Sequence, residues 1–485
     1  MTGRFVHSGW VALALVALVV ALGAPQPAQA GKIDSLLLPE GIEDTPPGKR
    51  DVNLLDPEPW NGSWARPGHR PLGVNFTSYD LTQEQIDAAK ATGCRMVRIE
   101  LPMERFISQA EPDWAVLDVV VSRLGRAGLE VVPVLTAKSV VPQFYREFCE
   151  SVAARYARSF RYYQILDNVN VQPGLYTRDY VELLIKVKLA ITLADPDARI
   201  VTGGIRGADM IYLDLLEAQG AKDCFDVIAF NVYPPMAGIE GEVPGLRRDH
   251  CIPRFDEVCQ WAAERGKAVW VTSLGVSTAY GGFGVDQLDQ ASAYARSALW
   301  LGWHGVERIF FAAIQDNDPS YSRPALSCGL LDVSGRPKAS YHALKKLNRM
   351  ISNAYHVDPV FSDRGAIYQV PDAATLMSIP PGELPEFDPY ADYMLHGVKV
   401  FGFWFYEPDL QEYRLVYWLE RYLVYDVIVS VGIRQDGLTP LEASLLLDDQ
   451  PQELDGDELW DFTLVSYVPI STLPGIIRYR VDPDE

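Results

Sequence analysis

An abrupt change of residue type near the middle of the chain marks the first candidate for chemistry. Residues 162–166 are aromatic, aliphatic or neutral amide residues, and Asp167, Asn168 and Asn170 come directly after them. A carboxyl group such as that of Asp167 can act as a general acid, whereas amide groups can only form hydrogen bonds. The stretch therefore combines a strand-like beginning with an end that could bind a polar ligand or transfer a proton.

The elements that would position these residues repeat along the chain. Apolar, strand-like runs occupy residues 72–77, 96–101, 130–136, 162–168, 199–205, 227–233, 268–274 and 308–314, with helical periodicity between them. Thr82 with Gln85 predicts a capping box at the start of one helix, and Asp195 with Pro196 predicts the end of another. This alternation predicts a parallel (β/α)8 barrel. A doubly wound sheet is the alternative, but no glycine-rich phosphate loop follows the first strand.

In such a barrel, the C-terminal ends of the strands meet at one face, where sites are built. Carboxyl, amide, hydroxyl and guanidinium groups hold these positions here: Asn75, Arg98, Glu100, Thr136, Lys138, Asp167, Asn168, Asn231, Tyr233, Ser273, Gln315 and Asp316. A serine hydroxyl needs a base to become a nucleophile, and the set contains no histidine that could activate Ser273.

Two of the strands resemble a known family. Residues 162–170 resemble the fourth strand of the retaining glycoside hydrolases of clan A, most closely family 39, which reads Tyr-Gln-Ile-Trp-Asn-Glu-Pro-Asn. Residues 268–275 resemble that family's seventh strand, Trp-Val-Thr-Glu-Phe-Gly. Arg98, Gln315, Asp316 and the segment 329–341 also match, so the resemblance covers about residues 71–350.

The resemblance implies a sugar-binding barrel but leaves both catalytic positions without an acid. Retaining glycosidases use one carboxyl group as acid/base and a second as nucleophile. The matched positions hold Asn168 for the acid/base and Ser273 for the nucleophile. Asp167 is the fallback acid, and Glu100 or Asp316 would have to supply the second carboxylate.

The family's sugar-facing wall is also changed. The resemblance implies substrate binding by Arg98, Asp167, Asn231, Tyr233, Gln315 and Asp316. Arg98 has a purely structural alternative, since it could pair with Glu100 or Asp167. Positions that carry aromatic residues in the family hold Met103, Leu166 and Ala312, and a histidine of its sixth strand is replaced by Asn231. Because sugars pack against aromatic faces, these changes keep a protein partner open beside a polysaccharide.

A change of pattern near residue 354 predicts a second domain. Short alternating runs at 398–406, 414–418, 424–431, 459–467 and 476–480 predict an antiparallel β-sandwich, with its tyrosines and tryptophans in the core or in cross-strand pairs. The predicted division is a signal peptide at 1–30, a leader or linker at 31–70, the glycoside-hydrolase-like barrel at 71–353 and the β-sandwich at 354–485.

The N-terminus predicts where the protein is located, and the composition limits its partners. Arg4, an apolar run at 10–22 and Ala28-Gln29-Ala30 predict a signal peptide and a secreted, periplasmic or extracellular protein, with an uncleaved anchor as the alternative. No later stretch is apolar enough to span a membrane.

The formal net charge of −21 argues against a nucleic-acid partner. Six cysteines fit no zinc spacing and leave disulfides and buried thiols both open.

These observations predict an exported, glycoside-hydrolase-like protein that needs no cofactor or metal and is catalytically inactive. It would bind a polysaccharide, an oligosaccharide or an exported protein through the barrel cleft. The alternative is an active glycosidase that hydrolyses O-glycosidic bonds through relocated carboxylates, Asp167 with Glu100 or Asp316. A third hypothesis has the barrel mouth plugged by the leader or a loop.

Overall fold

The computed structural model describes residue 64 and residues 69–107, 112–239, 251–279, 284–318 and 322–357. Beyond these it describes the segments 365–368, 394–395, 398–419, 428–433, 438–448, 451–454, 456–459, 462–469 and 471–481. The predicted signal peptide and almost all of the predicted leader lie outside the described residues, so the hypothesis of a plug from the leader stays a prediction.

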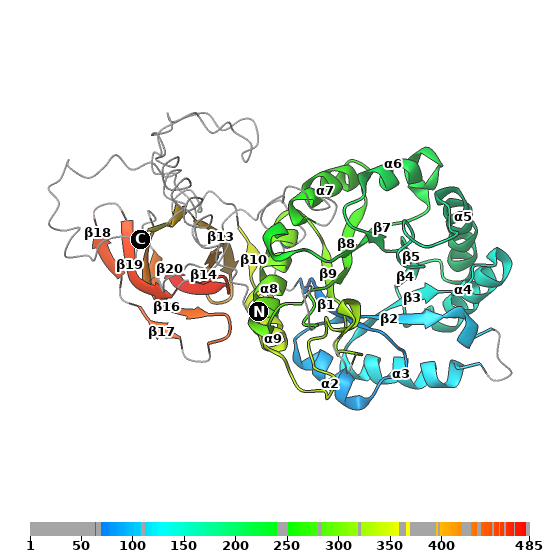
Figure 1. Cartoon of the computed structure of the whole chain (residues 1–485), viewed down its shortest axis with the longest axis horizontal. Helices are drawn as coiled ribbons and strands as arrows, with labels where there is room; N and C mark the ends of the chain where they lie inside the picture. The colour runs from blue at the N-terminus through cyan, green and yellow to red at the C-terminus, as the bar shows by residue number, and fades with distance from the viewer. Residues whose placement is uncertain are drawn as a thin grey trace, which may run out of the picture. The chain divides into compact units, whose positions relative to one another are not determined.

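Parallel strands close into a barrel in the first part of the described chain (Figure 1). They are β1 (Leu72–Phe76), β2 (Met96–Pro102), β3 (Glu130–Thr136), β4 (Tyr162–Ile165), β5 (Arg199–Val201), β6 (Ile205–Arg206), β7 (Val227–Val232), β8 (Ala268–Leu274) and β9 (Arg308–Phe311). The ring closes because β1 pairs with β9 and β5 pairs directly with β7. The short strands β5 and β6 divide the predicted strand 199–205. The predicted barrel is confirmed.

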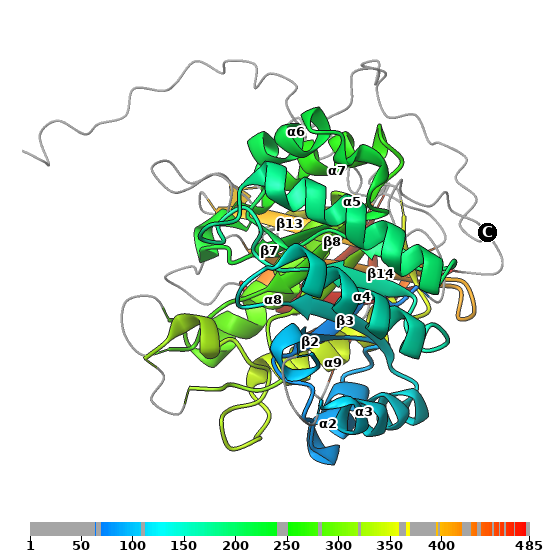
Figure 2. The ribbon, with the colours of Figure 1, turned by 90° about the vertical axis from the view of Figure 1, so that its right-hand side faces the viewer.

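Helices follow the strands and lie outside the ring (Figures 1 and 2). They are α2 (Gln83–Ala91), α3 (Trp114–Ala127), α4 (Pro142–Tyr156), α5 (Thr177–Ala194), α6 (Met210–Ala218), α7 (Phe255–Ala263), α8 (Gln287–Trp303) and α9 (Ala339–Ile351). Single 3-10 turns are η1 (Met103–Arg105), η2 (Ala221–Asp223), η3 (Met236–Gly238), η5 (Ile252–Arg254) and η6 (Pro324–Leu326). The capping box of Thr82 and Gln85 forms as predicted, and Asp195 ends α5.

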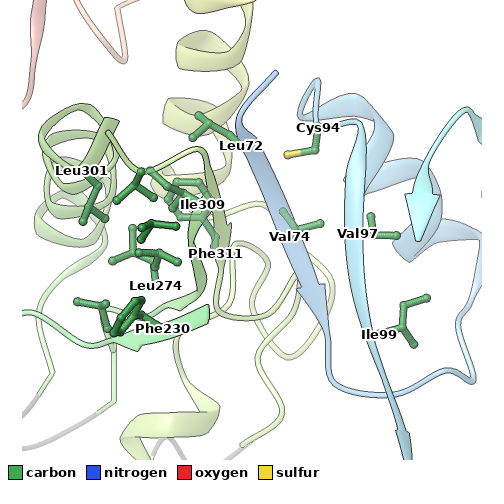
Figure 3. Close-up of a cluster of buried hydrophobic side chains, with 14 of the residues drawn as sticks. Leu72, Val74, Cys94, Val97, Ile99, Phe230, Leu274, Leu301, Ile309 and Phe311 are labelled. Atoms are coloured by element: carbon green, nitrogen blue, oxygen red, sulfur yellow. The ribbon is translucent and has the colours of Figure 1, made fainter. Parts of the chain in front are cut away.

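Alternating residues of each barrel strand face opposite sides of the wall. Leu72 and Val74 of β1 belong to the apolar layer between strands and helices, which Figure 3 shows in part. A second apolar cluster contains Met96, Val132, Tyr162, Val201, Val227, Ala229, Trp270 and Phe310. Because strand residues alternate with a period of two, Arg98 follows Met96, and Gln164 follows Tyr162, on this inner face. The polar residues thus lie one layer nearer the C-terminal ends of the strands, above an apolar floor.

The C-terminal part consists of antiparallel strands, as predicted. One sheet contains β10 (Tyr355–His356), β12 (Met394–Leu395), β13 (Val398–Glu407), β14 (Glu412–Leu419), β16 (Leu438–Leu445), β17 (Gln452–Glu453) and β20 (Gly475–Val481). The other contains β11 (Gly365–Tyr368), β15 (Ile428–Ile433), β18 (Gly456–Leu459) and β19 (Phe462–Pro469). Trp404 of β13 packs against Tyr413 of β14 and Tyr479 of β20, with ring centroids 6.3 and 5.5 Å away.

All six cysteines lie in the described part of the chain, and none of them forms a disulfide. Cys259 is half-buried and the other five are buried. Within the described residues, no helix is long and apolar enough to cross a membrane. The same part of the chain contains no group of three or more His, Cys, Asp or Glu residues that could hold a metal ion.

Candidate functional site

The turn after β4 carries Asp167 into the mouth of the barrel. Leu166 and Asn168 adopt the left-handed backbone conformation, with φ of 65° and 52°. For leucine this conformation costs roughly 1–2 kcal/mol, whereas asparagine tolerates it. Backbone bonds from Leu166 N–H to Leu135 O, 3.0 Å, and from Val169 N–H to Gly204 O, 3.1 Å, hold the turn. The left-handed residues explain why the strand ends at Ile165 rather than at residue 168 as predicted.

Asp167 is the centre of a polar network in the barrel mouth. Nη2 of Arg98 lies 3.0 Å from Oδ1 of Asp167, and Arg98 is only 3% exposed. Gln164 Nε2 and Asn231 Nδ2 donate to the same oxygen at 3.1 and 3.0 Å. Nε of Arg98 donates to Oε1 of Gln164 at 2.8 Å. The guanidinium charge is therefore matched by one carboxylate, which is one of the two structural pairings considered for Arg98.

Asn168 and its neighbours extend this network. Nδ2 of Asn168 donates to Oδ2 of Asp167 at 3.2 Å, and its Oδ1 accepts from Asn231 Nδ2 at 3.2 Å. Oγ1 of Thr272 donates to Oδ1 of Asn231 at 3.0 Å, and Nδ2 of Asn75 donates to the Thr272 carbonyl at 2.8 Å. An amide has no titratable proton, so Asn168 can orient a ligand but cannot act as an acid.

Ser273 lies at the end of β8 beside Tyr233. Their side-chain oxygens are 3.1 Å apart, and Ser273 is 6% exposed. A Cβ on Gly275 would lie 2.3 Å from Cε1 of Tyr233, so the tyrosine ring packs directly over the glycine backbone. Burial raises the pKa of Tyr233, which keeps its phenol neutral and unsuited as a base. Among the described residues, Ser273 has no hydrogen bond to a histidine that could activate its hydroxyl.

Glu100 is the second carboxyl group near Arg98. It lies two residues after Arg98 on β2 and therefore on the same face of that strand. No hydrogen bond or ion pair joins it to another residue in the part of the chain that the structure describes. Burial raises the pKa of Glu100, Arg98 opposes this effect, and the charge of Asp167 adds to it. The raised pKa is a property that general acids also have.

Gln315 and Asp316 form contacts outside the network around Asp167. Gln315 accepts from Gln85 Nε2 at 3.0 Å and donates to the Val333 carbonyl at 3.1 Å. Oδ2 of Asp316 lies 2.7 Å from Nζ of Lys338, with both side chains buried. Burial raises the pKa of Asp316 and lowers that of Lys338, because both charges are removed from water. Among the described residues, no hydrogen bond links this pair to the network around Asp167.

The network also contains residues that the sequence did not single out, Gln164 and Thr272. The sequence does contain a signal for these two residues, since each is a polar residue on the inward face of an otherwise apolar strand. A buried polar group needs a hydrogen-bond partner, so such residues are expected to join a network. The side chains of Met103, Leu166 and Ala312, which the resemblance matches to aromatic residues, are buried. Thr136 is half-buried, and Lys138 is exposed, with its backbone N–H donating to Glu104 Oε1 at 2.6 Å.

No family model matches the chain, and a search of curated protein sequences finds no significant match. Solved structures do match. A family 39 glycoside hydrolase from Bacteroides cellulosilyticus WH2 is 15% identical, with a TM-score of 0.59 over 84% of this chain and 81% of that protein. A glucosidase from Croceicoccus marinus is 12% identical, with a TM-score of 0.56 over 88% and 98%. A family 39 β-xylosidase from Caulobacter crescentus is 14% identical, with a TM-score of 0.54 over 86% and 97%.

These alignments extend over most of this chain and most of each neighbour, from the barrel into the C-terminal antiparallel sheets. At identities this low, the likeness concerns the fold rather than the chemistry. The resemblance read from the fourth and seventh strands is thereby confirmed at the level of structure: this chain has the fold of the family 39 glycoside hydrolases.

Proposed function

We propose that this protein is an exported, glycoside-hydrolase-like protein that binds a polysaccharide or oligosaccharide in the barrel mouth without hydrolysing it. The fold it shares with glycoside hydrolases supports the carbohydrate part of the proposal. The polar network at the C-terminal ends of the strands supports the position of the site, because barrel enzymes place their ligands there. The apolar run near the N-terminus supports export.

The observation that carries the inactive assignment is the chemistry at the two strand ends. Asn168 holds the position of the acid/base, and both ends of its amide are hydrogen-bonded to Asp167 and Asn231. By the resemblance, Ser273 takes the position of the nucleophile, and its hydroxyl lies beside a phenol that burial keeps neutral, that of Tyr233. A retaining mechanism needs a carboxyl group at each position, and an inverting one needs two carboxyl groups that flank the bond.

An active glycosidase is the second candidate, and Glu100 is the observation that favours it. Its carboxyl group has no described hydrogen-bond partner, lies near Asp167 and has a raised pKa. Glu100 would then be the acid, and Asp167 the nucleophile or base. Against this assignment, the Asp167 carboxylate is paired with Arg98 and accepts three amide hydrogen bonds, so its oxygens already have partners within the protein.

Two measurements on the full-length mature protein distinguish the candidates. The first is hydrolysis of a panel of aryl glycosides and polysaccharides, and the second is calorimetric binding of neutral oligosaccharides. We expect no turnover, and binding that is lost in Asp167→Ala. Turnover that disappears in both Asp167→Ala and Glu100→Gln would instead establish the active glycosidase. Absence of both turnover and binding would leave an exported protein as the partner.

A further inference from the structure

The donors around Asp167 in the barrel mouth are directed at acceptors of the protein itself. Arg98 is the cation of the network, and its Nε and Nη2 groups are directed at Gln164 and Asp167. Gln164 and Asn231 likewise direct their amide donors at Asp167. The donors of Arg98, Gln164 and Asn231 are therefore directed at Gln164 and Asp167 rather than at a ligand. A ligand that supplies hydrogen-bond donors of its own suits such a site.

Two acceptors in the mouth remain without a described partner. The first is the carboxyl group of Glu100, which is partly exposed. The second is Oδ1 of Asn75, a residue that is only 5% exposed. Nδ2 of Asn75 reaches from β1 past β9 to the Thr272 carbonyl on β8, so this side chain points into the barrel. A buried acceptor without a donor is unfavourable, and a ligand or water that donates to it removes the penalty.

The charges in the barrel mouth also favour a ligand that donates hydrogen bonds. When Glu100 and Asp167 are ionised, the two carboxylates outnumber the single guanidinium of Arg98, which leaves one negative charge in a partly buried space. A cationic donor would balance that charge, and ion pairs shielded from water are stronger than exposed ones. An ammonium group supplies both the charge and three N–H donors.

We propose that the barrel mouth selects sugars that carry a free amino group, with the ammonium bound between Glu100 and Asp167. This inference rests on the proposed carbohydrate binding and names the class of sugar. The same acceptors do not favour an acidic sugar, whose carboxylate would face Glu100 and Asp167. An N-acetylated sugar would offer a single neutral N–H and no charge.

The test is calorimetric titration of the full-length mature protein with three β-1,4-linked tetrasaccharides, of glucosamine, N-acetylglucosamine and glucose. The protein is strongly acidic, so a polycation could also bind its surface without specificity. The matched comparison is therefore Glu100→Gln against Asp197→Asn, which removes one exposed carboxylate after α5, at the opposite end of the barrel. Circular dichroism and thermal unfolding check that both variants keep the fold.

We expect the glucosamine tetramer to bind at least about tenfold more tightly than the other two, and Glu100→Gln to remove most of that preference while Asp197→Asn keeps it. Equal or weaker binding of the glucosamine tetramer would overturn the amino-sugar inference and leave the proposed function standing. An equal loss in both variants would also overturn it, because it would identify general attraction to an acidic surface. No binding of any tetrasaccharide would overturn the proposed function itself.

Discussion

A Cβ atom on Gly204 would lie 2.2 Å from Oδ1 of Asp167 and 2.6 Å from Nδ2 of Asn231. The carboxylate can occupy its present position only because residue 204 has no side chain. We expect Gly204→Ala to displace Asp167 from Arg98, to lower the free energy of unfolding by about 1–3 kcal/mol and to weaken ligand binding. Denaturant unfolding and calorimetry measure the two effects.

Gly125 in α3 provides the control, because a Cβ there would meet nothing within 4 Å. We expect Gly125→Ala to stabilise the protein by about 0.5–1 kcal/mol, since alanine favours the helix, and to leave binding unchanged. If Gly204→Ala behaves like Gly125→Ala, the close approach of Gly204 to Asp167 is not what fixes the carboxylate.

Restoring both acids should restore chemistry if only the chemistry has been lost. We expect the Asn168→Glu/Ser273→Glu double variant to hydrolyse aryl glycosides that the wild-type protein leaves intact. Ser273→Glu alone should act only on substrates with good leaving groups, because a general acid contributes roughly 10²–10⁴-fold in rate. Activity from Asn168→Glu alone would contradict this expectation and point to another carboxylate as the nucleophile.

The double variant carries a structural cost that must be measured beside its activity. Residue 168 has φ of 52°, where glutamate is about 1 kcal/mol less favourable than asparagine, and residue 273 is buried. We therefore expect a lower melting temperature. Unfolding curves recorded on the same preparations distinguish a variant that is inactive because it is unfolded from a folded variant whose site is inactive.

The buried ion pair of Asp316 and Lys338 is expected to be sensitive to the loss of one partner. Lys338→Met leaves the Asp316 carboxyl without its cation, 2.7 Å away in the wild type, and should lower the free energy of unfolding by about 3–5 kcal/mol. Adding Asp316→Asn should recover about 1–3 kcal/mol, because the uncompensated charge is removed and the amide oxygen can still accept from Gly329 N–H. A double variant less stable than the single one would contradict this account.

His356 should make stability depend on pH. Its ring packs against Phe403 and Phe405, and burial lowers its pKa from 6.5 to about 3. Between these two values the unfolded chain binds a proton that the folded chain does not, so stability falls as the pH decreases through this window. The slope from this group is at most about 1.4 kcal/mol per pH unit.

His356→Leu should therefore flatten the decline of unfolding free energy between pH 6.5 and pH 4, as urea unfolding at several pH values would measure. Carboxyl groups contribute equally to both proteins and cancel in the difference. His342→Leu is the control, because it removes a histidine whose side chain is exposed. Identical pH slopes for wild type and His356→Leu would show that His356 is protonated in the fold.

Periodicity was sufficient for the barrel, because each strand and helix is specified by local alternation and by end signals such as Thr82 and Asp195. It was insufficient at the end of β4, where the left-handed conformation of Leu166 contradicts the preference of that residue and is imposed by bonds to other strands. Strand β16 was missed because Pro440 argues against a strand, and the structure accommodates it at a bulge.

Some members of the network around Asp167 were predictable from the sequence, but their partners were not. Arg98, Asp167 and Asn231 follow from their positions at strand ends, and the structure joins them directly. Asp316 also ends a strand-like run, yet it pairs with Lys338 at the start of α9 rather than with the network around Asp167. Which of several equivalent polar groups meet depends on strand register and side-chain direction, and neither is encoded in spacing along the chain.

The six unpaired cysteines have a consequence for how the protein can be handled and where it can fold. The fold contains no covalent crosslink between them, and burial raises the pKa of Cys94 to about 11 and those of Cys259 and Cys328 to about 12. Since the thiolate is the form that reacts with oxidants, these three thiols remain protonated and react slowly at neutral pH. Native protein should thus be obtained equally from a reducing cytoplasm and from an oxidising compartment, with no need for a disulfide isomerase.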